Sequence, residues 1–251
     1  MGEGFQLADA ALARLAQGDL REPWRRWLAG GGAGDLPAGG RTPLDHVHVV
    51  RPFEDAWLAR LQAEFERYAD WHASEDDSAE PPNSMHSYGV PLEAMGLNGL
   101  AQDLLEQVVR PLAARLYADQ GGARLTGQYA FTVEYSDRGD FDLDLHVDDA
   151  AVTANLCLPG SFEGAELVFE GLRCPPHAQL PGPPDEVRSV TLEPGTLLLH
   201  LGAHRHRVTP IEGGCRQGLI LWAAGPAHGM AGYDTRLARE WCGICSARTA
   251  P

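Results

Sequence analysis

The second half of the chain is a succession of short strand-like segments, and this pattern constrains the fold more than any other. Each segment carries β-branched or alternating apolar residues, and glycine, proline or aspartate separates it from the next. The segments lie at 125–135, 142–148, 151–158, 165–169, 187–192, 196–201, 203–208 and 216–223. Because a helical block precedes them, they predict an α+β fold whose core is a jelly roll, a cupin-like double-stranded β-helix supported by N-terminal helices.

The first half of the chain shows apolar residues at helical spacing instead. The expected elements are one or two helices within 5–29, helices over 54–71 and 91–118, a closing helix at 229–240, a strand at 46–50 and a flexible connector at 30–40. We therefore predict an N-terminal helical extension and connector over 1–41. A single domain over 42–251 follows, with its jelly-roll core at about 124–223.

Charge and hydropathy exclude several classes of partner. The 251 residues include 20 basic and 35 acidic side chains, so a net charge of −15 repels phosphate backbones and no nucleic acid is expected to bind. No apolar run approaches the roughly 20 residues that cross a bilayer, and the composition of the first twenty residues argues against a secretory signal. An odd count of 5 cysteines favours a reducing compartment. We expect a cytoplasmic protein without a membrane partner; its oligomeric state stays open.

A single Cys-x-x-Cys motif, Cys242-Gly243-Ile244-Cys245, lies near the C-terminus. This spacing suits half of a zinc site or a redox pair. No second Cys-x-x-Cys and no His-x-x-x-His follows it, so a solvent-facing helix end is the alternative interpretation. The role of the two cysteines stays open at this point.

A histidine and a carboxylate lie two positions apart in the segment 142–148. Alternation along an extended chain places Asp144, His146 and Asp148 on one face, with leucine and valine on the other. Polar groups on a buried face need partners, and a metal ion would supply one for His146 and Asp148. We therefore predict that these two residues are ligands of one metal ion.

A distant histidine completes the ligand set. His204 and His206 share a face of their segment, so alternation alone does not choose between them. A hairpin that turns at Glu212-Gly213-Gly214 would place Val208 opposite Arg216, with His206 diagonal to the arginine. This pairing favours His206 as the third ligand.

Two histidines and one carboxylate leave half of the coordination sphere of iron(II) open. A 2-oxoacid would fill two of the open positions and dioxygen the last. Arg216, at the end of an otherwise apolar strand face, would bind the distal carboxylate through two charge-assisted hydrogen bonds. The expected cofactors are iron(II), the cosubstrate 2-oxoglutarate and dioxygen, with ascorbate as a stimulant of turnover.

Five stretches between Tyr129 and Trp222 share a family pattern: His-Val-Asp-Asp, Val-Thr-Ala-Asn-Leu-Cys-Leu, Phe-Glu-Gly-Ala-Glu-Leu-Val-Phe, His-Leu-Gly-Ala-His-Arg-His-Arg-Val and Gly-Cys-Arg-Gln-Gly-Leu-Ile-Leu-Trp. This half of the chain resembles the iron(II)- and 2-oxoglutarate-dependent oxygenases of the prolyl and lysyl hydroxylase superfamily. The segment 82–89 is similar to a branch of 2-oxoglutarate oxygenase domain proteins. The resemblance implies iron ligands at His146, Asp148 and His206, a 2-oxoglutarate clamp at Arg216, and neighbours of the cosubstrate or metal at Tyr135 and Asn155. Gly164-Ala165 departs from the Gly-Gly of many relatives.

The resemblance also implies hydroxylation of an unactivated C–H bond, with release of succinate and CO2. The run from Val152 to Phe169 favours an amino-acid-type substrate, either a peptidyl prolyl or lysyl side chain or a free amino acid or other small molecule. Two other functions stay open: a non-catalytic jelly roll that binds a metal or 2-oxoacid, and a zinc hydrolase, which uses the same ligand types. Arg216 and the lack of an obvious general base near the ligands count against the hydrolase.

Several polar residues have two interpretations. Tyr135 and Asn155 suit either core hydrogen bonding or contact with the cosubstrate. His200 and His204 are expected to be structural or to support the ligands. The polar loop around His86 either lines the substrate entrance or is solvated.

Overall fold

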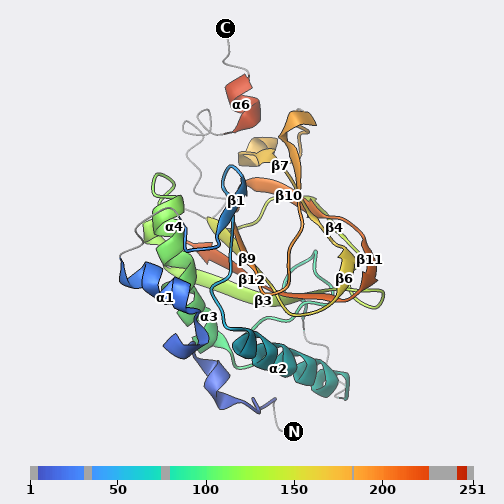
Figure 1. Cartoon of the computed structure of the whole chain (residues 1–251). Helices are drawn as coiled ribbons and strands as arrows, with labels where there is room; N and C mark the ends of the chain where they lie inside the picture. Colours follow the sequence, from blue (N-terminus) through green and yellow to red (C-terminus); the bar gives the residue numbers. More distant parts are fainter. Residues whose placement is uncertain (1–4, 31–35, 75–79, 183, 226–241, 248–251) are drawn as a thin grey trace.

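Two antiparallel sheets form the core of the computed structural model, which describes residues 5–30, 36–74, 80–182, 184–225 and 242–247 (Figure 1). The major sheet has the order β1 (Arg41–Leu44), β2 (Val47–Val50), β9 (Leu197–Leu201), β5 (Val152–Cys157), β12 (Arg216–Ala224), β3 (Gly127–Tyr135). The minor sheet has the order β4 (Leu143–His146), β10 (His204–Val208), β7 (Leu167–Leu172), β8 (Val187–Val190). A separate pair joins β11 (Ile211–Gly214) to β6 (Phe162–Gly164). The predicted α+β fold with a double-stranded β-helix core is confirmed.

Helices gather on one side of the strands, to the left of and below them in Figure 1. They are α1 (Glu22–Ala29), α2 (Asp55–Ser74), α3 (Asn98–Leu104), the π-helical turn η3 (Leu105–Val109) and α4 (Arg110–Leu116), with 3₁₀ turns η1 (Ala10–Ala13), η2 (Gln17–Asp19) and η4 (Gly122–Arg124). One hydrophobic cluster joins them to the major sheet, and Trp24 of α1 shares it with Leu156 and Leu219. The segment before residue 42 thus packs on the same core; the domain division at residue 41 stays a prediction.

Residues alternate between two hydrophobic clusters along β5 and β12. The side chains on the helix side are Val152, Ala154, Leu156, Leu219 and Leu221. Cys157 and Ile220 point the other way, into a second cluster between the sheets. This alternation needs only an extended backbone, whose side chains repeat every two residues.

The helix predicted over 91–118 begins only at Asn98. The preceding segment is tied to β3 instead, where the Leu92 N–H donates to the Ala130 carbonyl at 2.9 Å. Gly96 then turns the chain with a φ of 74°. Pairing of backbone groups along the edge of β3 outweighs the helical propensity of these residues.

The predicted hairpin between β10 and β12 is wrong. β10 pairs with β4 and β7, so Val208 lies opposite Leu143, while Arg216 lies opposite Tyr135 on β3. Residues 211–214, where the turn was expected, form β11 and pair with β6. Neighbouring strands of a chain pair often but not always, and here they belong to different sheets. The same assumption of local pairing missed the short strands β1, β6 and β11.

The remaining elements are short. The loop between β7 and β8 contains the 3₁₀ turns η5 (Pro175–His177) and η6 (Pro184–Glu186), and α6 (Gly243–Ala247) follows Cys242. The helix predicted over 229–240 lies outside the described residues. Within the described ranges, no helix combines the length and the apolar character that crossing a membrane requires.

Candidate metal centre

Three polar side chains converge at the end of β4 and on β10. His146 lies directly opposite His206 in the antiparallel pair, and their ring centroids are 4.3 Å apart. Asp148 follows β4 by two residues, and its N–H donates to the Gly202 carbonyl at 3.0 Å, which fixes the turn. Each of the three side chains offers one ligand atom, and these atoms all lie within 4.8 Å of one another. The structure therefore brings together the three residues that the sequence analysis proposed as ligands.

A bulge in β4 changes which residues face the site. His206 pairs with His146, but Val208 pairs with Leu143, so β4 has one residue more than β10 over this interval. Leu143 and His146 are both buried, whereas Asp144 is exposed. The predicted common face of Asp144 and His146 is therefore wrong, since strict alternation holds only in a regular strand.

Backbone carbonyls orient both imidazoles. His146 Nδ1 lies 2.7 Å from the Asp144 carbonyl, and His206 Nδ1 lies 2.9 Å from the His204 carbonyl. A carbonyl only accepts, so each Nδ1 carries the proton and each Nε2 keeps a lone pair. His146 Nε2 lies 3.3 Å from Asp148 Oδ1, and His206 Nε2 lies 3.9 Å from Asp148 Oδ2. Two imidazole nitrogens and one carboxylate turned toward one point are a donor set that fits iron(II).

Electrostatics favour the deprotonated ligand states. Burial alone would raise the pKa of Asp148, but the surrounding imidazoles, His206 first, hold that pKa well below its usual range. Burial lowers the pKa of His206 well below its usual value. Burial also opposes charge on His146, yet the hydrogen bond and charge of Asp148 outweigh it and raise the His146 pKa. The Asp148 carboxylate and the neutral His206 imidazole are therefore already in the form that binds a metal ion.

Two further residues hold Asp148 in place. Thr153 Oγ1 on β5 donates to Asp148 Oδ2 at 2.5 Å. His200 Nε2 on β9 lies 3.6 Å from the same oxygen, and its Nδ1 lies 2.9 Å from the Leu201 carbonyl. The sequence showed Thr153 as a polar residue on a buried strand face but did not identify its partner. His200 gave no signal beyond its residue type, because the pairing of β9 with β5 brings it to the site.

His204 lies apart from this group. Its ring meets the edge of Phe169 with centroids 4.8 Å apart, and its Nδ1 has no hydrogen-bond partner among the described residues. Burial lowers the pKa of His204 to about 3, so the imidazole is neutral. The His206 ring also packs on Phe169, with centroids 5.6 Å apart, but its Nε2 faces Asp148.

Arg216 is a buried cation, 1% exposed, whose hydrogen bonds go to uncharged groups. Its Nη1 donates to the Ala165 carbonyl at 2.8 Å, and its Nη2 lies 3.5 Å from Asn155 Oδ1. Its Cζ lies 5.2 Å from the centroid of the Tyr135 ring. Within the described part of the chain, Arg216 Nε has no hydrogen-bond partner. Burying a guanidinium without a counter-ion is costly, so this site fits a carboxylate ligand.

Strand β5 connects the guanidinium to the metal ligands. Thr153 bonds Asp148, and Asn155, two residues further on the same face, contacts Arg216. Two residues of a strand span about 6.6 Å, so a short stretch of β5 supports both Asp148 and the surroundings of Arg216. A Cβ on Gly218 of the adjacent strand would lie 3.0 Å from the Leu156 carbonyl oxygen, so a side chain at this position would crowd β5.

Two neighbours of Arg216 have constrained environments. Burial raises the pKa of Tyr135 well above its usual value, so its phenol keeps the proton next to the guanidinium. Ala165, which accepts from Arg216, has a φ of 49°, and Gly164 before it has a φ of 77°. The left-handed region suits glycine at both positions, so Ala165 keeps its conformation at a cost.

The loop upstream of β3 contributes His86 to the surroundings of the site. His86 is 5% exposed, its ring centroid lies 5.4 Å from that of Phe131, and its Nδ1 lies 3.1 Å from Asn83 Oδ1. Burial, and then the charge of His146, lowers the pKa of His86 to about 4. The interpretation of His86 as solvated is therefore wrong, whereas Tyr88 is 58% exposed.

Comparison with known proteins adds independent findings. Residues 37–122 match the family model of the OGFOD2-like domain, a range that contains α2, α3 and the His86 loop. The chain is 32% identical over 203 residues to the 2-oxoglutarate and iron-dependent oxygenase domain-containing protein CP2 of Arabidopsis thaliana, which covers 81% of this chain and 52% of that protein. It is 37% identical over 211 residues to the 2-oxoglutarate and iron-dependent oxygenase domain-containing protein 2 of Xenopus tropicalis. This match covers 80% of this chain and 55% of that protein. The chain thus spans about half the length of the curated relatives it matches.

Solved structures show a likeness of fold. A prolyl-4-hydroxylase from Pseudomonas putida superposes with a TM-score of 0.50 at 17% sequence identity, over 72% of this chain and 93% of that chain.

Proposed function

We propose that this chain is a 2-oxoglutarate- and iron-dependent oxygenase that hydroxylates an unactivated C–H bond of an amino-acid-type substrate. Its match to the OGFOD2-like family model and its similarity to curated oxygenase domain proteins support this proposal. The observation that carries the proposal is the buried Arg216, whose hydrogen bonds go to uncharged groups and which contacts the same strand, β5, that supports Asp148 of the His-Asp-His set. A metal site and a separate carboxylate receptor joined by one strand suit a chelating dicarboxylate better than a hydrolytic substrate.

Each residue has a role in this proposal. His146, Asp148 and His206 hold iron(II) on one side and leave the opposite side open. Iron(II) held there, together with 2-oxoglutarate and dioxygen, would supply the oxidising power for the hydroxylation, with succinate and CO2 as the products of 2-oxoglutarate. The chain itself orients the ligands through the carbonyls of residues 144 and 204, and holds the carboxylate of Asp148 through Thr153.

Arg216 receives the distal carboxylate of 2-oxoglutarate in this arrangement. Asn155 lies between the arginine and the metal ligands, where its amide can bond the cosubstrate, and the Tyr135 ring covers one face of the guanidinium. Phe169 and Ile220 line the same interior and exclude water from it. A dry site strengthens every charge interaction within it.

The most specific part of the proposal is the class of substrate. The fold likeness to a prolyl-4-hydroxylase and the hydroxylase-like run from Val152 to Phe169 favour an amino-acid-type side chain, in a peptide or as a small molecule. Within the described residues, His86 lies close enough to the site to influence which substrate enters.

The proposal is tested with purified protein, iron(II), 2-oxoglutarate, ascorbate and air. Succinate formation is expected even without substrate, at the slow rate of uncoupled turnover, and Asp148→Ala is expected to remove it. Peptide libraries and metabolite extracts are then searched by mass spectrometry for products with one added oxygen atom.

Other outcomes point to other functions. Tight 2-oxoglutarate binding with manganese(II) in place of iron, but no succinate under any condition, would show a non-catalytic binding protein. Activity that zinc supports and iron does not would show a hydrolase, because zinc inhibits an iron oxygenase.

A further inference from the structure

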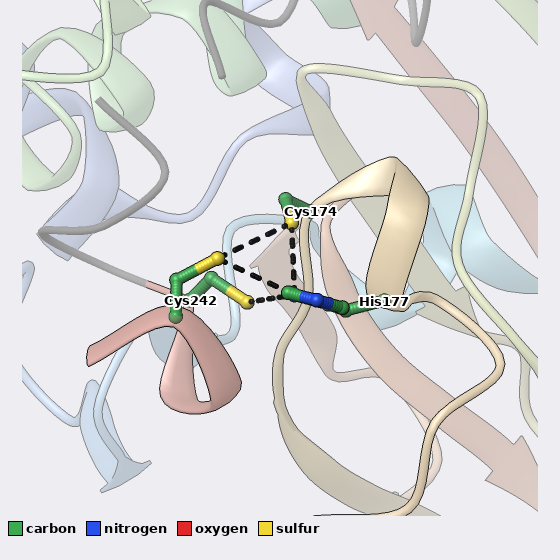
Figure 2. A group of neighbouring side chains, drawn as sticks. Cys174, His177 and Cys242 are labelled. Carbon is green, nitrogen blue, oxygen red and sulfur yellow. Dashed lines mark hydrogen bonds between the residues drawn. The ribbon is translucent and has the colours of Figure 1, made fainter. Parts of the chain in front are cut away.

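A second group of metal-binding side chains lies away from the His-Asp-His set. Cys174, His177, Cys242 and Cys245 each offer one ligand atom, and these atoms lie within 4.8 Å of one another. Figure 2 shows the sulfurs of Cys174 and Cys242 and the imidazole of His177 turned toward one another. Cys174 and His177 come from the loop after β7, whereas Cys242 and Cys245 come from α6 and the residue before it.

The distances between the ligand atoms are those of a tetrahedral site. His177 Nδ1 lies 3.3 Å from Cys174 Sγ, 3.3 Å from Cys245 Sγ and 3.6 Å from Cys242 Sγ. Cys174 Sγ lies 3.8 Å from Cys245 Sγ. Zinc–sulfur bonds of about 2.3 Å at tetrahedral angles put the sulfurs about 3.8 Å apart, and a nitrogen ligand lies slightly closer. We propose that these four residues form a structural zinc site that fastens the C-terminal segment to the β7–β8 loop.

The spacing in the sequence supports this assignment. Cys242 and Cys245 are separated by two residues, and so are Cys174 and His177, so the site has the paired two-by-two ligand pattern of structural zinc sites. The partner of the Cys-x-x-Cys motif therefore precedes it in the chain. Sequence analysis did not find this partner, because Cys-Pro-Pro-His lies in a proline-rich loop far from the motif.

All four ligand positions come from the protein, which distinguishes this site from the first. A closed tetrahedral site leaves no position for substrate, so its role is structural. Cys174 and Cys242 are both buried, which shields the metal–thiolate bonds from solvent. A distance of 3.8 Å between Cys174 and Cys245 also differs from the roughly 2.05 Å of a disulfide bond.

The site is built onto the strands that carry the iron ligands. Arg173, next to Cys174, is buried and pairs with Glu186, and its N–H donates to the Ala203 carbonyl at 2.9 Å, just before β10 begins. A Cβ on Gly243 would lie 2.2 Å from Glu186 Oε1, so glycine lets α6 approach this ion pair closely. Zinc at this site would therefore hold α6, the β7–β8 loop and the start of β10 together.

The experiment measures zinc in the full chain. Because the His-Asp-His centre can also accept zinc, the measurements use a His146→Ala/Asp148→Ala background. After gel filtration, elemental analysis is expected to find about one zinc per chain, and to find it lost when Cys174→Ser and Cys245→Ser are added. Cys215→Ser is the matched control, since Cys215 lies outside the cluster, and it is expected to keep the zinc.

A second measurement keeps the proposal testable if the serine variants do not fold. Cobalt(II) added to the metal-depleted background protein is expected to give the visible bands of a tetrahedral thiolate site, and His177→Cys is expected to shift these bands while keeping the metal. A folded background protein that holds no zinc and gives no thiolate bands would overturn the proposal. Unchanged zinc in the Cys174→Ser/Cys245→Ser variant would overturn it as well.

Discussion

Asp148 is fixed by groups from several separate strands. It lies beside His146 of β4 and His206 of β10, accepts a hydrogen bond from Thr153 of β5, and faces His200 of β9. A carboxylate held on every side needs little rearrangement when a metal ion binds. At the residue scale, Thr153 and His200, which lie outside the proposed ligand set, therefore help to preorganise it.

Thr153→Val tests this support. Valine keeps the shape of the side chain but cannot donate to Asp148 Oδ2, so iron(II) affinity is expected to fall about 10- to 100-fold. Thr196→Val is the control, because Thr196 is equally buried but donates to the Glu193 carbonyl. Iron titrations that do not separate the two variants would remove Thr153 from the site.

Arg216→Ala tests the carboxylate receptor. Alanine would remove the charge-assisted hydrogen bonds between the guanidinium and the distal carboxylate of 2-oxoglutarate, which contribute about 1.5–3 kcal/mol. The 2-oxoglutarate concentration for half-maximal turnover is therefore expected to rise by about 10- to 100-fold. The expected change in iron affinity is small, since Arg216 does not contact His146, Asp148 or His206 in the structure. Gln217→Ala, on the opposite face of β12, is the control and should leave both quantities unchanged.

At the scale of elements, polar contacts attach the N-terminal turns to the helices beneath them. The carboxylate of Asp103 in α3 accepts from Arg14 Nε at 2.6 Å, from Arg14 Nη2 at 2.7 Å and from the Leu15 N–H at 2.9 Å. Asp103 is 3% exposed, so these donors replace the water it has lost. The hydrogen bond from Arg14 is the first cause that holds the pKa of Asp103 below its usual value.

This lowered pKa predicts a pH dependence of stability. A depressed pKa in the folded state means that Asp103 stabilises the fold above its unfolded pKa of about 3.9, and that the stabilisation is lost as the pH falls below that value. Asp103→Asn is therefore expected to lower the free energy of unfolding at pH 7 by about 1 kcal/mol, with a smaller difference from wild type near pH 3. Urea titrations of wild type and Asp103→Asn at both pH values measure this difference in the free energy of unfolding. The exposed Glu93→Gln is the control. A difference between wild type and Asp103→Asn that grows toward pH 3 would contradict the stabilising role of the Asp103 carboxylate.

At the scale of the whole molecule, the helices and the major sheet form one hydrophobic cluster. It includes Leu12 and Trp24 near the N-terminus, Leu61 of α2, and Leu199 and Leu221 of the sheet. A core shared in this way couples the N-terminal segment to the strands that carry the site, so both are expected to unfold together.

Trp24→Ala tests this coupling. Trp24 is 1% exposed, so its truncation is expected to cost about 3–5 kcal/mol of the free energy of unfolding. Circular dichroism and the release of 2-oxoglutarate should then shift to the same lower denaturant concentration. Arg25→Ala, exposed on the same helix, should change neither; separate transitions would show that the N-terminal segment folds independently.

Much of this protein could be predicted from residue type and periodicity alone. The strand faces of β5 and β12 follow from a period of two residues, and the helix α2 follows from a stripe of apolar residues. The choice of His146, Asp148 and Arg216 as site residues came from polar residues on predicted core strands, from their spacing and from the resemblance to a known family, and it stays a prediction.

The pairing of distant strands was decided by the tertiary structure. The bulge that exposes Asp144, the pairing of Arg216 with Tyr135 and the approach of His200 to Asp148 depend on which strands are neighbours, and local periodicity carries no information about that. The same holds for the four-residue cluster around Cys174 and Cys245, since two short motifs so far apart become one group of ligands only when the fold closes.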